Sequence, residues 1–147
     1  MTNKLQAPRN KFQTHFELYP EVQSVLGKLQ KRGVLLAVIS NWQKGLSHFC
    51  TELGIRDYFE VIISSAEVGI EKPDARIFEE ASHRLRLAPQ FILHVGDQEI
   101  EDFIGAQSAG FRSVLSCRER KRDNVDSIAS LTEIEDMVDE SPGRNSC

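Results

Sequence analysis

Two carboxylates, Asp97 and Asp102, follow an apolar run that has the length of a buried strand, residues 91–95. Ligands normally bind at the carboxyl ends of parallel strands, and a pair of carboxylates there suits a hard cation such as magnesium. Asp97 also stands where a helix is expected to begin after Gly96, and aspartate is among the best residues for capping a helix. By itself, this stretch supports a metal site and a helix cap equally.

Polar residues also follow two other apolar runs. Ser40 and Asn41 come directly after residues 34–39, and Lys72 lies in the loop after residues 59–63. A hydroxyl with neighbouring backbone N–H groups can hold phosphoryl oxygens, a lysine can neutralise their charge, and a carboxylate can fix magnesium. Each residue also has an ordinary explanation as a helix cap or a solvated loop charge. Because the ends of parallel strands share one edge of the sheet, the combination predicts a phosphoryl-binding site.

The elements that must position these residues alternate between strand and helix. Short continuous apolar runs are typical of strands buried on both faces, and apolar stripes at helical spacing lie between them. The expected strands are residues 34–39, 59–63, 91–95 and 113–117. The expected helical stripes are Val22, Val25, Leu26 and Leu29; residues 44–53; Ile77, Phe78, Ala81 and Leu85; Ile100, Phe103, Ile104 and Gln107; and, after a capping box at residues 130–133, Ile134, Met137 and Val138. The alternation predicts an α/β fold with a mostly parallel sheet.

Three segments resemble motifs of the haloacid dehalogenase superfamily, in the family's order. They are VISN at residues 38–41, EKPDARIF at residues 71–78 and GDQEIED at residues 96–102. LYPEV at residues 18–22 resembles the point where such chains return from their cap domain into the core. The resemblance covers about residues 18–138 and implies a Rossmannoid core of the haloacid dehalogenase type, with a mostly parallel sheet flanked by helices.

The resemblance also implies a role for each candidate residue. Ser40 and Asn41 would bind the phosphoryl group, and Lys72 would bind it too and act in catalysis by stabilising an aspartyl-phosphate intermediate. Asp97 would ligate magnesium, and Asp102 would orient the site or bind the metal through water. The implied activity is magnesium-dependent hydrolysis of a small phosphorylated substrate.

The sequence departs from the family in one motif. Family enzymes carry an Asp-x-Asp motif at the end of their first strand, whose first Asp is the nucleophile, but Asp57 is the first aspartate here and no Asp-x-Asp occurs. The residues before LYPEV are also too few for a cap. We therefore expect a core that lacks its first, central strand and its cap. The expected parts are a cap or linker remnant at residues 1–19, a partial core at 20–140 and a tail at 141–147.

Without the attacking carboxylate we expect turnover near background and weak or lost magnesium binding. The alternative is a noncatalytic remnant that binds phosphate, a metal or a protein partner at the open sheet. The missing strand would lie between the strands that end at Ser40 and Gly96, and these strands could close on each other or leave a slot for water or another chain. A weak alternation that could supply a substitute strand runs through Phe12, Thr14, Phe16 and Leu18.

The composition argues against several other classes of function. The 147 residues carry a formal net charge of -4, which argues against a nucleic-acid-binding protein although residues 118–122 are locally basic. No apolar run of membrane-spanning length and no signal-peptide pattern occurs, and the three cysteines lack metal-site spacing. We expect a soluble protein without nucleic-acid or membrane partners, located in the cytoplasm with the nucleus as the alternative.

Two further residues stand close to the candidate site. His94 lies inside an expected strand, where a core histidine bonded to a neighbour is favoured over a catalytic one. Trp42 follows the turn at Ser40 and Asn41, and packing is favoured over contact with substrate.

Overall fold

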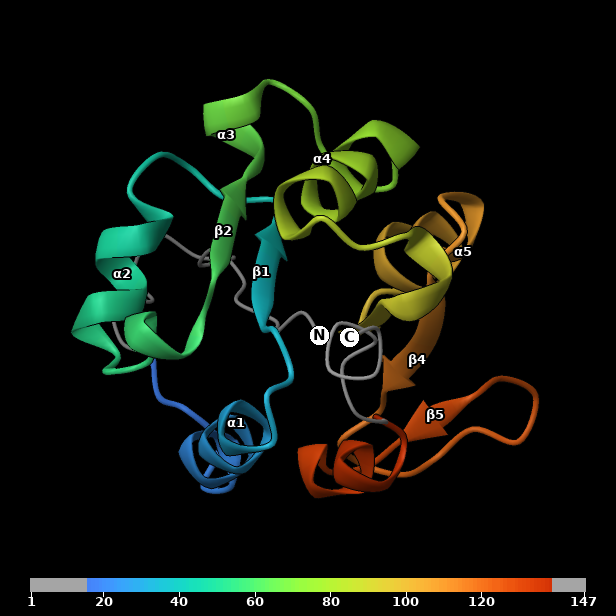
Figure 1. Ribbon diagram of the computed structural model, residues 1–147. Helices are drawn as coiled ribbons and strands as arrows, with labels where there is room; N and C mark the ends of the chain where they lie inside the picture. Colours follow the sequence, from blue (N-terminus) through green and yellow to red (C-terminus); the bar gives the residue numbers. More distant parts are fainter. Residues whose placement is uncertain (1–15, 139–147) are drawn as a thin grey trace, which may run out of the picture.

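Residues 16–138, which the computed structural model describes, alternate between short parallel strands and helices (Figure 1). The strands are β1 (Ala37–Ser40), β2 (Val61–Ser64), β3 (Leu93–Gly96), β4 (Arg112–Ser116) and β5 (Ser127–Ile128). The α-helices are α1 (Val22–Lys31), α2 (Leu46–Glu52), α3 (Ser65–Val68), α4 (Ala75–Leu85) and α5 (Gly105–Ser108). A π-helix forms η3 (Glu99–Ile104), and 3-10 turns form η1 (Arg56–Tyr58), η2 (Pro89–Phe91) and η4 (Leu131–Asp136). The predicted α/β class with parallel strands between helices is confirmed.

The strands form two separate groups. β1 pairs with β2 in parallel, so that Ser40 lies opposite Ser64, and β3, β4 and β5 form a second parallel group in which Gly96 lies opposite Leu115. Within the described part of the chain, no hydrogen-bonded ladder joins β1 to β3. The two strands that were expected to flank a missing strand therefore do not pair with each other.

Side-chain packing holds the two strand groups together. One hydrophobic cluster contains Val38 of β1 and Val95 of β3 beneath α1, α2 and η4. A second cluster contains Ile39 of β1 and Ile63 of β2 beneath α4 and α5. Because α1 and α4 lie on opposite sides of the strands (Figure 1), the architecture has three layers. The first of these clusters buries apolar side chains from both strand groups and so connects them within the described residues.

Polar contacts fasten α1 to the C-terminal part of the chain. Glu21, at the start of α1, accepts hydrogen bonds from Arg118, from the Ser130 hydroxyl and from the backbone N–H of Leu131. At the other end of the helix, Arg32 donates to the carbonyl oxygens of Glu135 (2.7 Å) and Val138 (2.5 Å). Both ends of α1 are thus tied to residues that follow β4.

Three of the predicted strands begin later than expected. β1, β2 and β3 start at Ala37, Val61 and Leu93, each two or three residues beyond the start of its apolar run. Leu35 is 36% exposed and Phe91 57% exposed, so the apolar runs extend past the sheet into turns. Hydrophobicity marks a buried strand, but it does not mark the residue at which ladder hydrogen bonds begin.

The predicted stripe of the fourth helix is wrong. Ile100 and Ile104 are 61% and 50% exposed, whereas Asp102 and Phe103 are buried. The segment is a π-helix, in which the N–H of Phe103 reaches the carbonyl of Gln98 five residues earlier. A π-helix has a wider turn than an α-helix, so residues at α-helical spacing no longer share a face. The stripe predicted for α4, in contrast, is buried throughout.

The segment whose weak alternation could supply a substitute strand lies only partly within the described residues. Phe12 and Thr14 lie outside the described residues, while Phe16 and Leu18 are not in a strand and pack against the cluster beneath α1. The Phe16 ring meets Trp42 edge to face with 5.8 Å between centroids, and Trp42 stacks on Phe49 at 5.0 Å. Trp42 is therefore a packing residue, as predicted.

Three basic residues of the segment after β4 form ion pairs. Arg118 pairs with Glu21, Lys121 with Glu133, and Arg122 with Glu99. The predicted capping box is confirmed: Ser130 accepts from the N–H of Thr132, and Glu133 accepts from the N–H of Ser130, although the helix that follows is 3-10 rather than α.

Candidate active site

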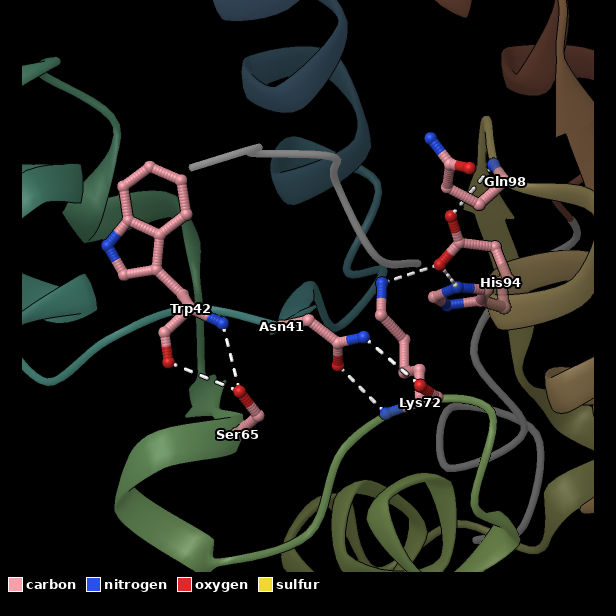
Figure 2. A network of polar contacts seen from close by, with 7 residues as sticks. Asn41, Trp42, Ser65, Lys72, His94 and Gln98 are labelled. Atoms are coloured by element: carbon pink, nitrogen blue, oxygen red, sulfur yellow. Dashed lines mark hydrogen bonds and ion pairs between the residues drawn. The ribbon is translucent and has the colours of Figure 1, made fainter. Parts of the chain in front are cut away.

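The loop that carries Lys72 is held by Asn41, the first residue after β1. The Asn41 amide donates to the Lys72 carbonyl oxygen (3.1 Å), and the Asn41 side-chain oxygen accepts from the Lys72 backbone N–H (2.8 Å). Figure 2 shows these two contacts side by side. They fix both the position and the orientation of the Lys72 backbone. The Asn41 side chain thus holds this loop, and its binding of phosphate stays a prediction.

The side chain of Lys72 extends from this loop to Asp102 in η3. Figure 2 shows the Lys72 side chain running toward the carboxylate that lies beside His94. Its Nζ lies 2.5 Å from Oδ1 of Asp102, and the two side chains are only 10% and 3% exposed. A charge-assisted hydrogen bond of this length between buried groups is among the strong polar contacts of a protein. It also joins the loop after β2 to the helix after β3.

Asp102 is held by three donors. Besides Lys72, His94 Nε2 lies 3.0 Å from Oδ1, and the backbone N–H of Gln98 donates to Oδ2 at 3.1 Å. Burial by itself would raise the pKa of Asp102, but the His94 hydrogen bond and the Lys72 charge together hold the pKa below its ordinary range. Asp102 is therefore a carboxylate at neutral pH.

A glycine makes room for Asp102. A Cβ atom at Gly96 would lie 2.2 Å from Cγ of Asp102, which is far inside contact distance. The carboxylate consequently lies directly against the backbone at the end of β3, and this contact explains why the Gly-Asp pair needs its glycine.

Ser40 and Asp97 occupy the ends of β1 and β3. Ser40 is 2% exposed and immediately precedes Asn41, while Asp97 is half-buried and immediately precedes Gln98. Each is thus one residue away from a member of the network around Lys72 and Asp102. The structure brings Asn41, Lys72 and Asp102 into direct contact and puts Ser40 and Asp97 beside them along the chain.

The turn after Asn41 is fixed by two serines at the end of β2, Ser64 as its last residue and Ser65 directly after it. Ser64 donates its hydroxyl to the carbonyl oxygen of Trp42 (2.8 Å), and Ser65 accepts from the Trp42 backbone N–H (3.0 Å). The Trp42 ring points away from Lys72 (Figure 2). These hydroxyls, for which the sequence predicted no role, position the chain that leaves Ser40.

The donor set suits magnesium in part. Among the described residues, no group of three or more histidine, cysteine or acidic side chains could hold a metal ion. Both oxygens of Asp102 already accept hydrogen bonds, which favours an orienting role for this residue and leaves Asp97 as the better candidate ligand. Magnesium commonly takes one or two carboxylates and completes its shell with water and phosphate oxygens, so Asp97 could contribute to such a site.

Neither cysteine of the described residues has the environment of a nucleophile. Cys50 is buried beneath α1, and burial raises its thiol pKa to about 11. Cys117 is half-buried and free.

Across residues 16–138, no helix has both the length and the apolar character that a membrane span requires.

The parallel strands and the lysine–carboxylate pair beside their carboxyl ends give an α/β architecture with charged residues gathered at one edge of the strands. The chain belongs to the haloacid dehalogenase-like hydrolase family, whose model matches residues 1–116. The family model overlaps the expected range of 18–138 at residues 18–116 and also includes residues 1–17. The division into segments at residues 19 and 140 stays a prediction.

Individual relatives agree with this assignment. The chain is 43% identical over 86 residues to haloacid dehalogenase-like hydrolase domain-containing protein 3 of Mus musculus, a match that covers 58% of the chain and 34% of the relative. It is 36% identical over 129 residues to glyceraldehyde 3-phosphate phosphatase of Methanothermobacter thermautotrophicus, covering 81% of the chain and 55% of the relative. The crystal structure of a phosphatase of this family from Thermococcus onnurineus superposes with a TM-score of 0.79 at 28% identity, covering 84% of the chain and 59% of that structure. The chain therefore spans between a third and three fifths of the length of these relatives.

Proposed function

We propose that residues 16–138 form the phosphoryl-binding part of a hydrolase that acts on small phosphate esters. Ser40 and Lys72 bind phosphoryl oxygens, Asp97 holds magnesium, and Asn41 and Asp102 position Lys72. The observation that carries this proposal is the fixed Lys72 ammonium, 2.5 Å from Asp102, where the loop after β2 meets the end of β3. The phosphatase among the similar proteins supports phosphate esters as the substrate class.

Each side chain contributes electrostatics or geometry. The Lys72 ammonium neutralises charge on phosphoryl oxygens, and such preorganised charge is usually the largest single catalytic effect. The Ser40 hydroxyl donates to a phosphoryl oxygen, and Asn41 keeps the Lys72 backbone in place. When bound, magnesium supplies further neutralisation of the phosphoryl charge.

Covalent phosphoryl transfer also requires an attacking carboxylate, and no Asp-x-Asp occurs in this sequence. Loss of a nucleophile can lower the rate by about a million-fold. We infer that the chain by itself binds magnesium weakly, does not turn over substrate, and needs a strand ending in Asp-x-Asp from elsewhere.

From the cysteine pattern, we further propose that the protein resides in the cytoplasm.

A hydrolysis assay tests this proposal. The chain and its Asp97→Ala variant are incubated with magnesium and an aryl phosphate, first alone and then with a peptide that carries an apolar strand ending in Asp-x-Asp. The control peptide has both aspartates replaced by asparagine. We expect no difference between the two proteins alone, and hydrolysis with the Asp-x-Asp peptide that Ser40→Ala, Lys72→Ala and Asp97→Ala each abolish.

Two results would change the conclusion. A robust rate without peptide that Asp97→Ala abolishes would mean that another carboxylate acts as the nucleophile. If the peptide binds but restores no hydrolysis, while the chain still binds phosphate or magnesium, a noncatalytic binding role is the better description.

A further inference from the structure

His94 is a buried polar residue in the centre of β3. It is 1% exposed, and the edge-to-face contact with Phe78 of α4 brings the two rings to 5.1 Å between centroids. Its Nε2 lies 3.0 Å from Oδ1 of Asp102. Burying an imidazole costs free energy, and this cost is offset only if the ring is hydrogen-bonded. An apolar side chain at this position would carry no such cost.

The hydrogen bond between His94 and Asp102 has a defined direction. Asp102 is ionised, so its oxygen must accept and the imidazole must carry a proton on Nε2. Burial lowers the pKa of His94 to about 4, which keeps the ring neutral at neutral pH. A neutral imidazole that donates to Oδ1 orients the carboxylate without competing with Lys72 for its charge.

The three donors leave Asp102 a single position. Oδ1 accepts from both His94 and Lys72, and Oδ2 accepts from the backbone N–H of Gln98. The His94 ring extends from β3 and the Gln98 N–H lies in the turn after it, so both donors come from the part of the chain next to Asp102. Among the donors from the described residues, the Lys72 side chain is the one that arrives from another part of the chain.

We propose that His94 is a positioning residue that holds the Asp102 carboxylate in the orientation that fixes the Lys72 ammonium in the candidate site. The proposal rests on the function proposed above for Lys72. It assigns the imidazole to the same task on the Asp102 side that Asn41 performs on the Lys72 backbone. The two residues together hold Lys72 at both ends.

Competitive acetylation of lysines tests this assignment without any phosphate or metal. The full chain is treated with acetic anhydride, and mass spectrometry compares acetylation of Lys72 with that of the exposed Lys31 and Lys44 in the same sample. His94→Leu removes the donor, whereas His94→Gln keeps an N–H donor at a similar position. His83→Leu makes the same substitution at an exposed site of α4 and serves as the control.

We expect His94→Leu to raise the relative acetylation rate of Lys72 by about tenfold, because a hydrogen bond to a charged group is worth at least that factor in an equilibrium constant. His94→Gln should stay close to the wild-type rate, and His83→Leu should leave it unchanged. If His94→Leu does not fold by circular dichroism, His94→Met provides a second donor-free variant of flexible shape.

Equal Lys72 acetylation in the wild-type, Leu and Gln proteins would overturn the assignment, as would an equal increase in the Leu and Gln proteins. The first result would mean that the imidazole only fills space, and the second that its shape rather than its donor matters. Failure of the hydrolysis assay with the expected acetylation pattern would refute the proposed function while leaving the positioning role of His94 intact.

Discussion

At the scale of single residues, Gly96 decides where Asp102 can lie. Any side chain at this position would overlap the Asp102 carboxylate, since the first side-chain atom would lie 2.2 Å from Cγ. The lysine contact, the histidine contact and the Gln98 contact all depend on that carboxylate position. A single methyl group added at Gly96 therefore affects all three contacts to Asp102.

Gly96→Ala should destabilise the chain by about 1–3 kcal/mol, the usual range for overpacking a filled interior. Urea unfolding followed by circular dichroism measures the effect. Gly27→Ala in α1 is the matched control, because its Cβ would lie 3.8 Å from the Tyr58 ring, at ordinary contact distance. Alanine is favoured over glycine inside a helix, so the control should be neutral or slightly stabilising. Similar unfolding midpoints for the two variants would contradict this account of Gly96.

The lowered pKa of His94 predicts a pH dependence of stability. Between pH 6.5 and about 4 the unfolded chain protonates this residue and the folded chain does not. The unfolded state then binds more protons, so the free energy of unfolding must fall as the pH is lowered through this window, by roughly 3 kcal/mol in total. The contribution of Asp102, whose pKa is also lowered, is lost only in stronger acid, below about pH 4.

Urea titrations at several pH values across this window measure the slope. His94→Gln should flatten it, because glutamine does not titrate, while His83→Gln on the surface should leave it unchanged. A wild-type slope that persists in His94→Gln would assign the proton uptake to another group.

At the scale of elements, α1 connects regions that are far apart in sequence. Its apolar side packs against both strand groups, and its ends are tied to the segment after β4 through Glu21 and Arg32. The Glu21 carboxylate accepts three hydrogen bonds, from Arg118, from the Ser130 hydroxyl and from the N–H of Leu131.

Glu21→Ala should lower the free energy of unfolding by about 1–3 kcal/mol, because half-buried donors at Ser130 and Leu131 lose their acceptor. Glu60→Ala removes an equivalent charge from an exposed position before β2 and should change stability by less than about 0.5 kcal/mol. Chemical unfolding at high and low salt measures both. A loss that disappears in high salt would show that only the charge of the half-buried Arg118 matters rather than the hydrogen bonds.

At the scale of the whole molecule, the interruption between β1 and β3 is the main feature. The described strands form two groups that share one hydrophobic cluster but no ladder. A strand placed between them would pair its backbone with both groups, and backbone polar groups in the interior are strongly favoured to pair.

A peptide that carries an apolar strand should therefore raise the melting temperature of the chain. At a hundred times its Kd, a ligand that binds only the folded state stabilises it by about 2.7 kcal/mol. Differential scanning calorimetry with the Asp-x-Asp peptide and with a scrambled peptide of the same composition measures the shift. A chain that melts cooperatively at high temperature, with no gain from either peptide, would mean that its strand groups are complete as they stand.

The sequence by itself determined the order of elements, their parallel arrangement and the residues that gather at the strand ends. Helical and strand periodicities record which side chains are buried, as the stripe of α4 shows, and the motifs record which chemistry is present. These are local properties, so adjacent residues suffice to reveal them.

Only the tertiary structure decided how those residues act on one another. Neither the Asn41 contacts to the Lys72 backbone nor the His94 contact to Asp102 is visible in spacing. Asn41 and Lys72 are 31 residues apart, and His94 and Asp102 lie 8 residues apart in different elements, so both pairs meet only through the fold. The π-helix that turns Asp102 inward and Ile100 outward is likewise set by the network around the carboxylate, whose three donors outweigh the α-helical preference of a short segment. The separation of β1 from β3 is a property of backbone pairing between distant strands, which no local pattern encodes.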